Sequence, residues 1–257
     1  MTNGIFDYEK EAYVPGIKVQ DFSSRGRVSR IKGKTTNRIH HLISDLQTNL
    51  FYLLDYEESI TDIKEHYPLL DLEEVVSDLA DIRLDKFIDK KTGEKYVFTT
   101  TFVITLKSMS GEKYLALSVR NESELYRDLT LEKLELERRY WNKKRIGWAI
   151  ITNKDLPMIK VKNIKWLYLG YTDIDFDKEQ YIRQMITSRI NLNQFMLKDI
   201  LSYIDKELLL IVGTSLGVLK NMIIDKELIV NMDIPIDIEM LTSDIIVNFK
   251  EVTKRAL

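Results

Sequence analysis

The stretch YVFTTTFVITLK, residues 96–107, decides the fold of this chain. It is rich in Thr, Val, Phe and Ile, which β-strands favour. A turn sequence, SMSGE, follows it, and KYLALSVR, residues 113–120, then pairs naturally with the first run as a β-hairpin. The rest of the fold is predicted outward from this hairpin.

Helix and strand patterns lie on both sides of the hairpin. Apolar spacing predicts helices at 44–56, with Ser44 as a possible N-cap, at 71–84 and at 130–144. A strand is predicted at 59–70, ending near Pro68, and the short apolar run 146–152 is typical of a central strand. This order predicts an α/β fold in which helices cover the faces of a mixed sheet.

The pattern changes around residues 165–178. An acidic connector, YTDIDFDKE, leads into mainly helical patterns and a β-wing near Leu228–Met232, an arrangement similar to a winged helix. We therefore expect two domains, 1–168 and 169–257. The candidate recognition helix, 215–224, carries Lys220 alone as a basic residue, so we expect the second domain to dock protein rather than read DNA.

Composition narrows the class of protein. Apolar residues make up 44% of the chain and charged residues 30%, which is typical of a soluble globular protein. The absence of cysteine excludes disulfides and thiolate metal sites, and three histidines leave little for a zinc cluster. There is no run of eighteen apolar residues, and the acidic N-terminus does not resemble a signal peptide. A cytoplasmic protein without a membrane partner is expected.

The strongest local feature of charge is SSRGRVSRIKGKTTNR, residues 23–38, which contains no acid. Such a segment is attracted to phosphate backbones by counterion release, although it also suits a solvated basic loop. Its candidate DNA-binding residues are Arg25, Arg27, Arg30, Lys32, Lys34 and Arg38.

Five segments match one family in register, from about residue 10 to 170: EAYVPGIKVQDFSSRGRVSRI, RIHHLISDL, ITDIKEHYPLLDLEE, TLEKLELERRYW and NIKWLY. Together they resemble the TnsA family, the endonuclease subunits of heteromeric bacterial cut-and-paste transposases. The resemblance implies a restriction-endonuclease-like first domain that cuts the 5′ strands at transposon ends. It also implies DNA, a TnsB-type transposase and a TnsC-type regulatory ATPase as partners.

The family's chemistry needs two acids that hold Mg²⁺, a further ligand, and a lysine two residues beyond it that helps to activate water. By motif, the helix acid falls on Gln47 in SDLQ, the strand acid on Thr101 in TTTFV, the further ligand on Ser118, and the lysine on Arg120 in SVRN. Gln47 and Thr101 offer only neutral oxygens, and Arg120 can grip a phosphate but cannot transfer a proton. We therefore expect no metal site and no cofactor.

The resulting hypothesis is a TnsA-like subunit that binds transposon-end DNA and partner subunits, with lost or altered 5′-strand cleavage. The alternative is an active Mg²⁺-dependent endonuclease that uses non-standard ligands or a partner subunit. A stand-alone DNA-binding regulator, and a chain that pairs with an intact TnsA copy, are also left open.

Individual residues allow simpler interpretations. Gln47 could be an ordinary surface amide of its helix, and Arg120 could form a salt bridge with Glu122 or Glu124. The candidate replacement metal ligands are Asp45, Asp55 and Asp62. Asp45 should point away from the Gln47 side of the helix, which makes Asp62 the better placed of these acids.

Overall fold

The computed structural model describes residues 13–18, 27–79, 81–88, 93, 95–169, 174–190 and 195–249. The chain divides into two compact units, Met1–Leu156 and Pro157–Leu257. The division precedes the boundary predicted after residue 168, so the segment 157–168 groups with the second unit.

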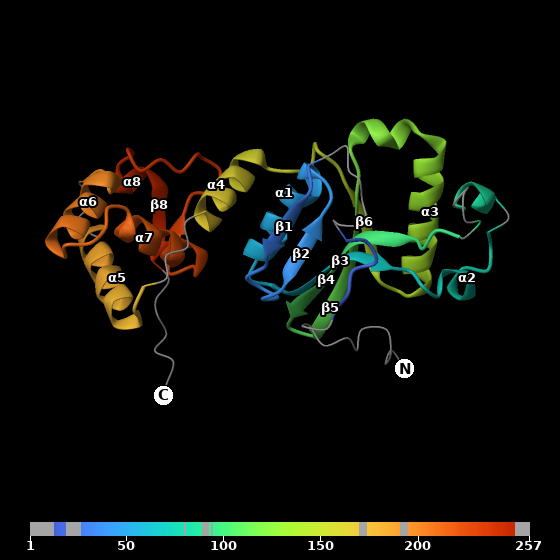
Figure 1. Ribbon diagram of the computed structural model, residues 1–257, viewed down its shortest axis with the longest axis horizontal. Helices are drawn as coiled ribbons and strands as arrows, with labels where there is room; N and C mark the ends of the chain where they lie inside the picture. The colour runs from blue at the N-terminus through green and yellow to red at the C-terminus, as the bar shows by residue number, and fades with distance from the viewer. Residues whose placement is uncertain are drawn as a thin grey trace. The chain divides into compact units, whose positions relative to one another are not determined.

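A four-stranded mixed sheet forms the centre of the first unit (Figure 1). Its strands, in order across the sheet, are β3 (Ile60–Pro68), β4 (Thr99–Ser108), β5 (Gly111–Val119) and β6 (Gly147–Ile151). β3, β4 and β5 are antiparallel neighbours, whereas β6 pairs with β5 in parallel. The predicted hairpin and the α/β class are confirmed.

The sequence predicted β6 as a central strand. That prediction is wrong, because β6 lies at the edge of the sheet. Its apolar run has another cause. Trp148 packs against the core on one face of the sheet, and Ala149 and Ile151 pack against the core on the other. An edge strand covered on both faces has the same composition as a central one.

Two helices cover opposite faces of the sheet (Figure 1). α1 (Asp45–Tyr56) packs its apolar side on a core that includes Leu117, and α3 (Asp128–Lys143) packs on a core that includes Ala116. Neighbouring residues of a strand point to opposite faces, which explains why these two belong to different cores. α1 begins as predicted, because the Ser44 side chain accepts a hydrogen bond from the backbone N–H of Gln47.

The predicted helix at 71–84 is wrong. Among the described residues of this range, which leave out residue 80, only Leu72–Val75 (α2) is α-helical, and a short 3₁₀ turn (η2) follows at Leu84–Lys86. Side chains of α3 explain the difference. Tyr140 and Lys144 bind the carboxylate of Asp71 at 2.7 and 2.6 Å, and Arg139 binds Asp81. These contacts fix the segment 71–84 to α3 at two points, and it does not form a continuous helix.

A second antiparallel hairpin was not predicted. β1 (Ser29–Lys32) lies in the basic segment and β2 (Ile39–Leu42) follows that segment directly, with Gly33 in the turn between the two strands. A Cβ on Gly33 would lie 2.9 Å from both the His40 ring and the Thr36 hydroxyl, so only glycine fits there.

The second unit is mainly helical, as predicted. Its helices are α4 (Met158–Tyr168), α5 (Phe176–Ile190), α6 (Leu197–Glu207), α7 (Thr214–Ile224) and the short α8 (Thr242–Ile245). β7 (Leu228–Val230) begins where the wing was predicted and pairs with β8 (Ile246–Phe249). α4 belongs to this unit because the Asn163 amide donates to the carbonyls of Met232 and Ile234. Among the described residues, no helix is long and apolar enough to cross a membrane.

Candidate functional site

The predicted site residues come from α1, β4 and β5 in the first unit. Gln47 lies in the first turn of α1 and Thr101 lies in β4. Ser118 lies near the end of β5, and Arg120 directly follows that strand. Gln47, Thr101 and Ser118 are buried, and the Arg120 side chain keeps 17% of its surface exposed. What each side chain binds decides what the site can do.

The Gln47 side chain completes the cap of α1. Its Oε1 atom accepts a hydrogen bond at 3.0 Å from the backbone N–H of Ile43, while the backbone N–H of Gln47 donates to the Ser44 hydroxyl. This is close to a capping box, in which a Glu or Gln in the first helical turn reaches back toward the N-cap. Gln47 is therefore not a surface amide, and its carbonyl oxygen already has a donor inside the protein.

The hydroxyl groups of Thr101 and Ser118 also form hydrogen bonds within the protein. Thr101 Oγ1 accepts from the backbone N–H of Val119 at 3.0 Å, which links β4 to β5. Ser118 Oγ accepts from the indole N–H of Trp148 at 2.9 Å and donates to the carboxylate of Glu137. These hydroxyls hold the ends of the strands together.

Glu137 of α3 is the residue that sequence reasoning missed. Its side chain is fully buried, and its Oε1 atom lies 3.6 Å from Nη2 of Arg120. Arg120 also donates to the carbonyl of Val119 at 2.7 Å. Arg120 does form a salt bridge, as the simpler interpretation allowed, but its partner is Glu137 and not Glu122 or Glu124. A signal was available, because Glu137 lies three residues after Leu134 and four before Trp141, on the buried stripe of the helix.

The charges around Glu137 compensate one another. Burial raises the pKa of the Glu137 carboxyl above its ordinary value, although Arg120 and then Lys133 oppose this shift. Burial, followed by the charge of Arg120, lowers the pKa of Lys133. We call Ser118, Arg120, Lys133 and Glu137 the Glu137 cluster; it contains one carboxylate and two cations.

None of the three candidate replacement ligands is arranged for a metal. Asp45 is exposed, as expected for a side chain that points away from Gln47. Asp55 accepts at 2.9 Å from the backbone N–H groups of both Lys34 and Thr35, and Asp62 accepts from the N–H of Ile63. Within the described part of the chain, no group of three or more His, Asp or Glu side chains could hold a metal ion.

Mg²⁺ prefers anionic oxygens in near-octahedral geometry. At the positions that the motifs predict for the ligands, the chain supplies an amide and two hydroxyls, each of which already accepts a hydrogen bond, and a guanidinium stands at the position predicted for the lysine. This set of donors does not fit Mg²⁺.

The basic side chains of the segment 23–38 differ in their exposure to solvent. Arg25 lies outside the described residues, and the exposed basic side chains are those of Arg27, Arg30, Lys32 and Lys34. Arg38 was expected among the DNA-binding residues, but its guanidinium binds Glu65 through two hydrogen bonds of 3.0 and 2.6 Å. The structure therefore removes Arg38 from the DNA-binding set and assigns it to the core.

Glu65 fastens the β1/β2 hairpin to the sheet. Besides Arg38, it accepts from the His40 ring at 2.8 Å and from the His41 backbone N–H at 3.1 Å. Burial would raise the pKa of Glu65, but hydrogen bonds from His40 and Arg38 outweigh burial and lower it to about 2. The exposed basic side chains thus stand on a hairpin that is anchored by a buried, ionised network.

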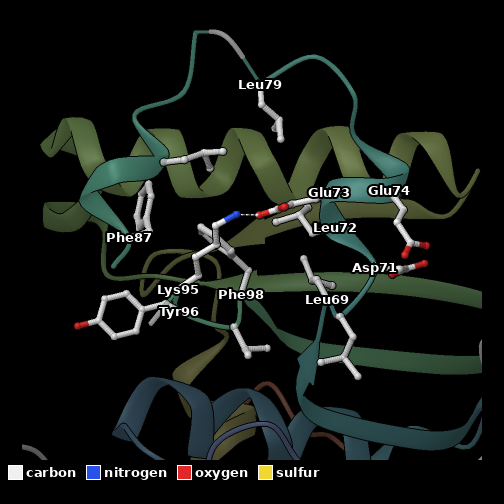
Figure 2. A pocket seen from close by; sticks show the side chains of 13 residues that line it. Leu69, Asp71, Leu72, Glu73, Glu74, Leu79, Phe87, Lys95, Tyr96 and Phe98 are labelled. Atoms are coloured by element: carbon white, nitrogen blue, oxygen red, sulfur yellow. Dashed lines mark hydrogen bonds and ion pairs between the residues drawn. The ribbon is translucent and has the colours of Figure 1, made fainter. Parts of the chain in front are cut away.

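A separate hollow of about 350 Å³ lies beside α2 (Figure 2). Its walls are mostly apolar, including Leu69, Leu72 and Phe98, and Lys95 pairs with Glu73 at 2.5 Å. Gln47, Thr101, Ser118 and Arg120 do not line it, so the hollow is separate from the predicted site.

Comparison with known proteins agrees with the division of the chain. Residues 57–153 match the family model of the TnsA-like endonuclease N terminal, and residues 155–232 match that of the TnsA endonuclease C terminal. Together the two matches cover more than half of the chain. The chain belongs to the TnsA family. Thr101, Ser118 and Arg120 lie inside the first match, and Gln47 precedes it.

One relative of this TnsA-family chain is the transposon Tn7 transposition protein TnsA of Escherichia coli. It is 40% identical over 163 residues, which make up 63% of this chain. The chain spans 58% of that relative's length.

Proposed function

We propose that this TnsA-family chain is a subunit of a Tn7-type transposition complex that binds transposon-end DNA and partner subunits, and that its 5′-strand cleavage is lost or altered. One observation carries the proposal. Every family-equivalent position holds a neutral or cationic side chain that is engaged inside the protein.

Electrostatics support the loss of the metal site. The Glu137 carboxylate was not predicted as part of the site, and it supplies two further oxygen atoms. However, the cations Arg120 and Lys133 lie beside it. A divalent cation entering the Glu137 cluster would meet two positive charges and one carboxylate that is already compensated. A phosphate would instead be attracted by both cations.

DNA binding is assigned to the β1/β2 hairpin. Arg30 and Lys32 are two residues apart on β1 and both are exposed, so they stand on one face, while Ile31 between them packs toward the core. Basic side chains on a fixed strand suit a phosphate backbone, whose counterions they release on binding.

The second unit supports contact with protein, in a complex with a TnsB-type transposase and a TnsC-type ATPase. Most of α7 is buried, including Val218, Lys220 and Met222, so this helix cannot enter a DNA groove as a recognition helix would. The burial of α7 therefore argues against the reading of DNA by this unit.

A nicking assay tests the proposal. A duplex that carries the transposon end, labelled on each strand in turn, is incubated with the chain, the transposase and either Mg²⁺ or Mn²⁺. We expect binding of the end without a cut in the 5′ strand, and cointegrate products of transposition in cells. A cut in the 5′ strand that requires the metal, together with simple insertions alone, would contradict the proposal.

A carboxylate, Glu137, does lie beside Arg120, and this favours one second candidate, an endonuclease that the partner subunit completes. On that account a partner would supply the missing acids beside Glu137 and Arg120. The same assay separates the two, because cleavage would then appear on addition of the transposase and disappear in Arg120→Ala and Glu137→Gln.

A further inference from the structure

His41 lies on the basic face of the β1/β2 hairpin. It is the direct cross-strand partner of Arg30, and Lys32 lies on the same strand as Arg30 with one residue between them. Paired residues of an antiparallel hairpin point to the same face, as do alternate residues along a strand. The His41 side chain is partly exposed, whereas that of its neighbour His40 points inward and is fully buried. The basic face therefore continues from Arg30 to the imidazole of His41.

The strand β3 changes face at His66. Ile63 packs against the core that contains α1, and Tyr67 packs against the core that contains α3, although residues four apart on a regular strand would share a face. His66 lies between them with a φ of +47°, a left-handed conformation that is uncommon for residues other than glycine. This irregularity brings one ring of β3 between the hairpin and α3.

The His66 ring connects the hairpin with α3. Burial lowers the pKa of His66 to about 4, against the charge of Glu65 and a hydrogen bond with the backbone of His41, and the charge of Lys133 lowers this pKa further. The ring therefore contacts the hairpin at His41, lies close to the ammonium of Lys133 and is neutral at pH 7. His41 and Lys133 are neighbours of the same ring.

Lys133 is a cation whose charge is not compensated within the first unit. Glu137 is the carboxylate that acts on Lys133, and it already lies 3.6 Å from Nη2 of Arg120. Neither a hydrogen bond nor an ion pair joins Lys133 to another residue in the part of the chain that the structure describes. Two cations thus share one carboxylate, and an anion would compensate the remaining positive charge.

We propose that His41 and Lys133 bind phosphate groups of the transposon-end DNA, and that one DNA strand runs from the β1/β2 hairpin past His66 to the Glu137 cluster. The inference rests on the proposed function for the identity of the DNA. It extends the DNA-binding surface from the hairpin to α3.

The two residues contribute in different ways. Lys133 supplies a positive charge, which attracts a phosphate directly. Burial lowers the pKa of His41, against the charge of Glu65 and together with the charge of Arg30, so its ring is neutral at pH 7. A neutral imidazole still carries one N–H donor, and His41 therefore supplies a hydrogen bond without a charge.

The test compares three full-length variants: His41→Ala, Lys133→Met and the control Lys143→Met. His41→Ala keeps the backbone N–H that binds Glu65, and methionine keeps most of the apolar stem of lysine. Lys143 is an exposed cation at the end of the same helix as Lys133. Fluorescence anisotropy measures binding to a duplex that carries the transposon end at several salt concentrations, and melting temperatures report on folding.

We expect Lys133→Met to bind about four-fold more weakly at about 0.2 M salt and to reduce the slope of log K against log salt concentration by about 1, because one charged phosphate contact is lost. His41→Ala should bind about ten-fold more weakly with an unchanged slope, because a hydrogen bond to a charged group is lost and a charge is not. The control should bind like the wild type.

Unchanged affinity in either His41→Ala or Lys133→Met, while Arg30→Ala/Lys32→Ala still weakens binding, would overturn the inference and leave the proposed function intact. A loss in Lys143→Met equal to that in Lys133→Met would also overturn it, because any cation of the helix would then act alike. If the wild type did not bind the end, the DNA-binding part of the proposed function would fail as well.

A second measurement locates the contacts on the DNA. Neutral methylphosphonates replace single phosphates along each strand in turn. The replacement that weakens binding at the Lys133 contact should have no effect in Lys133→Met and its full effect in Lys143→Met. The same strand should carry the phosphates that become insensitive in Arg30→Ala/Lys32→Ala. Contacts on opposite strands, or a pattern that Lys133→Met leaves unchanged, would overturn the path.

Discussion

Glu137 is a fully buried carboxylate whose charged neighbours include two cations, Arg120 and Lys133. Burial of an ionised group is costly unless a partner lies close to it. In the family's pattern a lysine would stand at residue 120, whereas here a guanidinium reaches the carboxylate from that position. At the scale of the residue, Arg120 and Glu137 form an internal ion pair.

Loss of the Arg120 guanidinium should therefore destabilise the protein in a pH-dependent way. Glu137 has a raised pKa, so the folded state binds more protons than the unfolded state, and stability falls as the pH rises through the folded pKa. Arg120→Met should raise that pKa further and lower the free energy of unfolding at pH 7 by about 1–3 kcal/mol. The loss should shrink toward pH 4, where the carboxyl is protonated.

Urea unfolding at pH 4, 5.5 and 7 measures this effect, with Arg120→Lys as the control that keeps the positive charge. An equal loss for Arg120→Met at all three pH values would show that Glu137 is not the group that Arg120 compensates.

For Glu65 the dependence of stability on pH has the opposite sign. Its folded pKa of about 2 lies below the ordinary value of 4.5, so its contribution is complete above pH 5 and is lost as the pH falls toward 2. The shift corresponds to about 3 kcal/mol. Glu65→Gln should lower stability by about this amount at pH 7 and flatten the acid limb of the stability curve, while the exposed control Glu112→Gln should do neither. An acid limb as steep in Glu65→Gln as in the wild type would contradict this assignment.

At the scale of elements, the β1/β2 hairpin converts a basic segment into a surface of defined geometry. Each lysine or arginine that contacts a phosphate contributes nearly one unit to the slope of log K against log salt concentration. Arg30→Ala/Lys32→Ala should therefore weaken binding to all DNA sequences and reduce the slope by about 2.

Fluorescence anisotropy across a range of salt concentrations measures the slope. Lys107→Ala/Lys113→Ala removes two exposed lysines from β4 and β5 and is the matched control. If both pairs change the slope equally, the hairpin has no special role in DNA binding.

Elements whose structure follows from local pattern were predicted well. The hairpin 96–120 and the capped helix at 44–56 depend on β-branched residues and on Ser44, which act over a few residues. The prediction of a helix at 71–84 failed because tertiary contacts from Tyr140, Lys144 and Arg139 override local helix propensity. The β1/β2 hairpin was missed because Asp55 and Glu65, which fix it, are distant in the sequence.

The site was predictable only in part for the same reason. The motifs located Gln47, Thr101, Ser118 and Arg120 by their neighbours in sequence. The pairing of Arg120 with a helix residue seventeen positions away could not be read from spacing, although the buried stripe of that helix pointed to Glu137. Arg38 was counted as a DNA contact because its partner, Glu65, lies on another strand.

At the scale of the whole molecule, the chain divides into two units, Met1–Leu156 and Pro157–Leu257, and the proposal assigns DNA binding to the first and partner binding to the second. The first unit carries the Glu137 cluster and the basic hairpin, and the second carries the helices that we propose contact partner subunits. Substitutions in one unit should leave the other unit's binding unchanged, because no side chain named in one task takes part in the other. Arg30→Ala/Lys32→Ala should thus keep full affinity for partner subunits; a parallel loss of partner and DNA affinity would show that the two tasks are coupled.

Titration of the purified chain with Mn²⁺, followed by the electron paramagnetic resonance of the unbound ion, tests the central claim most directly. The wild type should take up no Mn²⁺ at the Glu137 cluster at millimolar concentrations, whereas Gln47→Glu/Thr101→Asp/Arg120→Lys should bind it, because two carboxylates return to the family's positions. One Mn²⁺ bound per wild-type chain, and released in Glu137→Gln, would contradict the account.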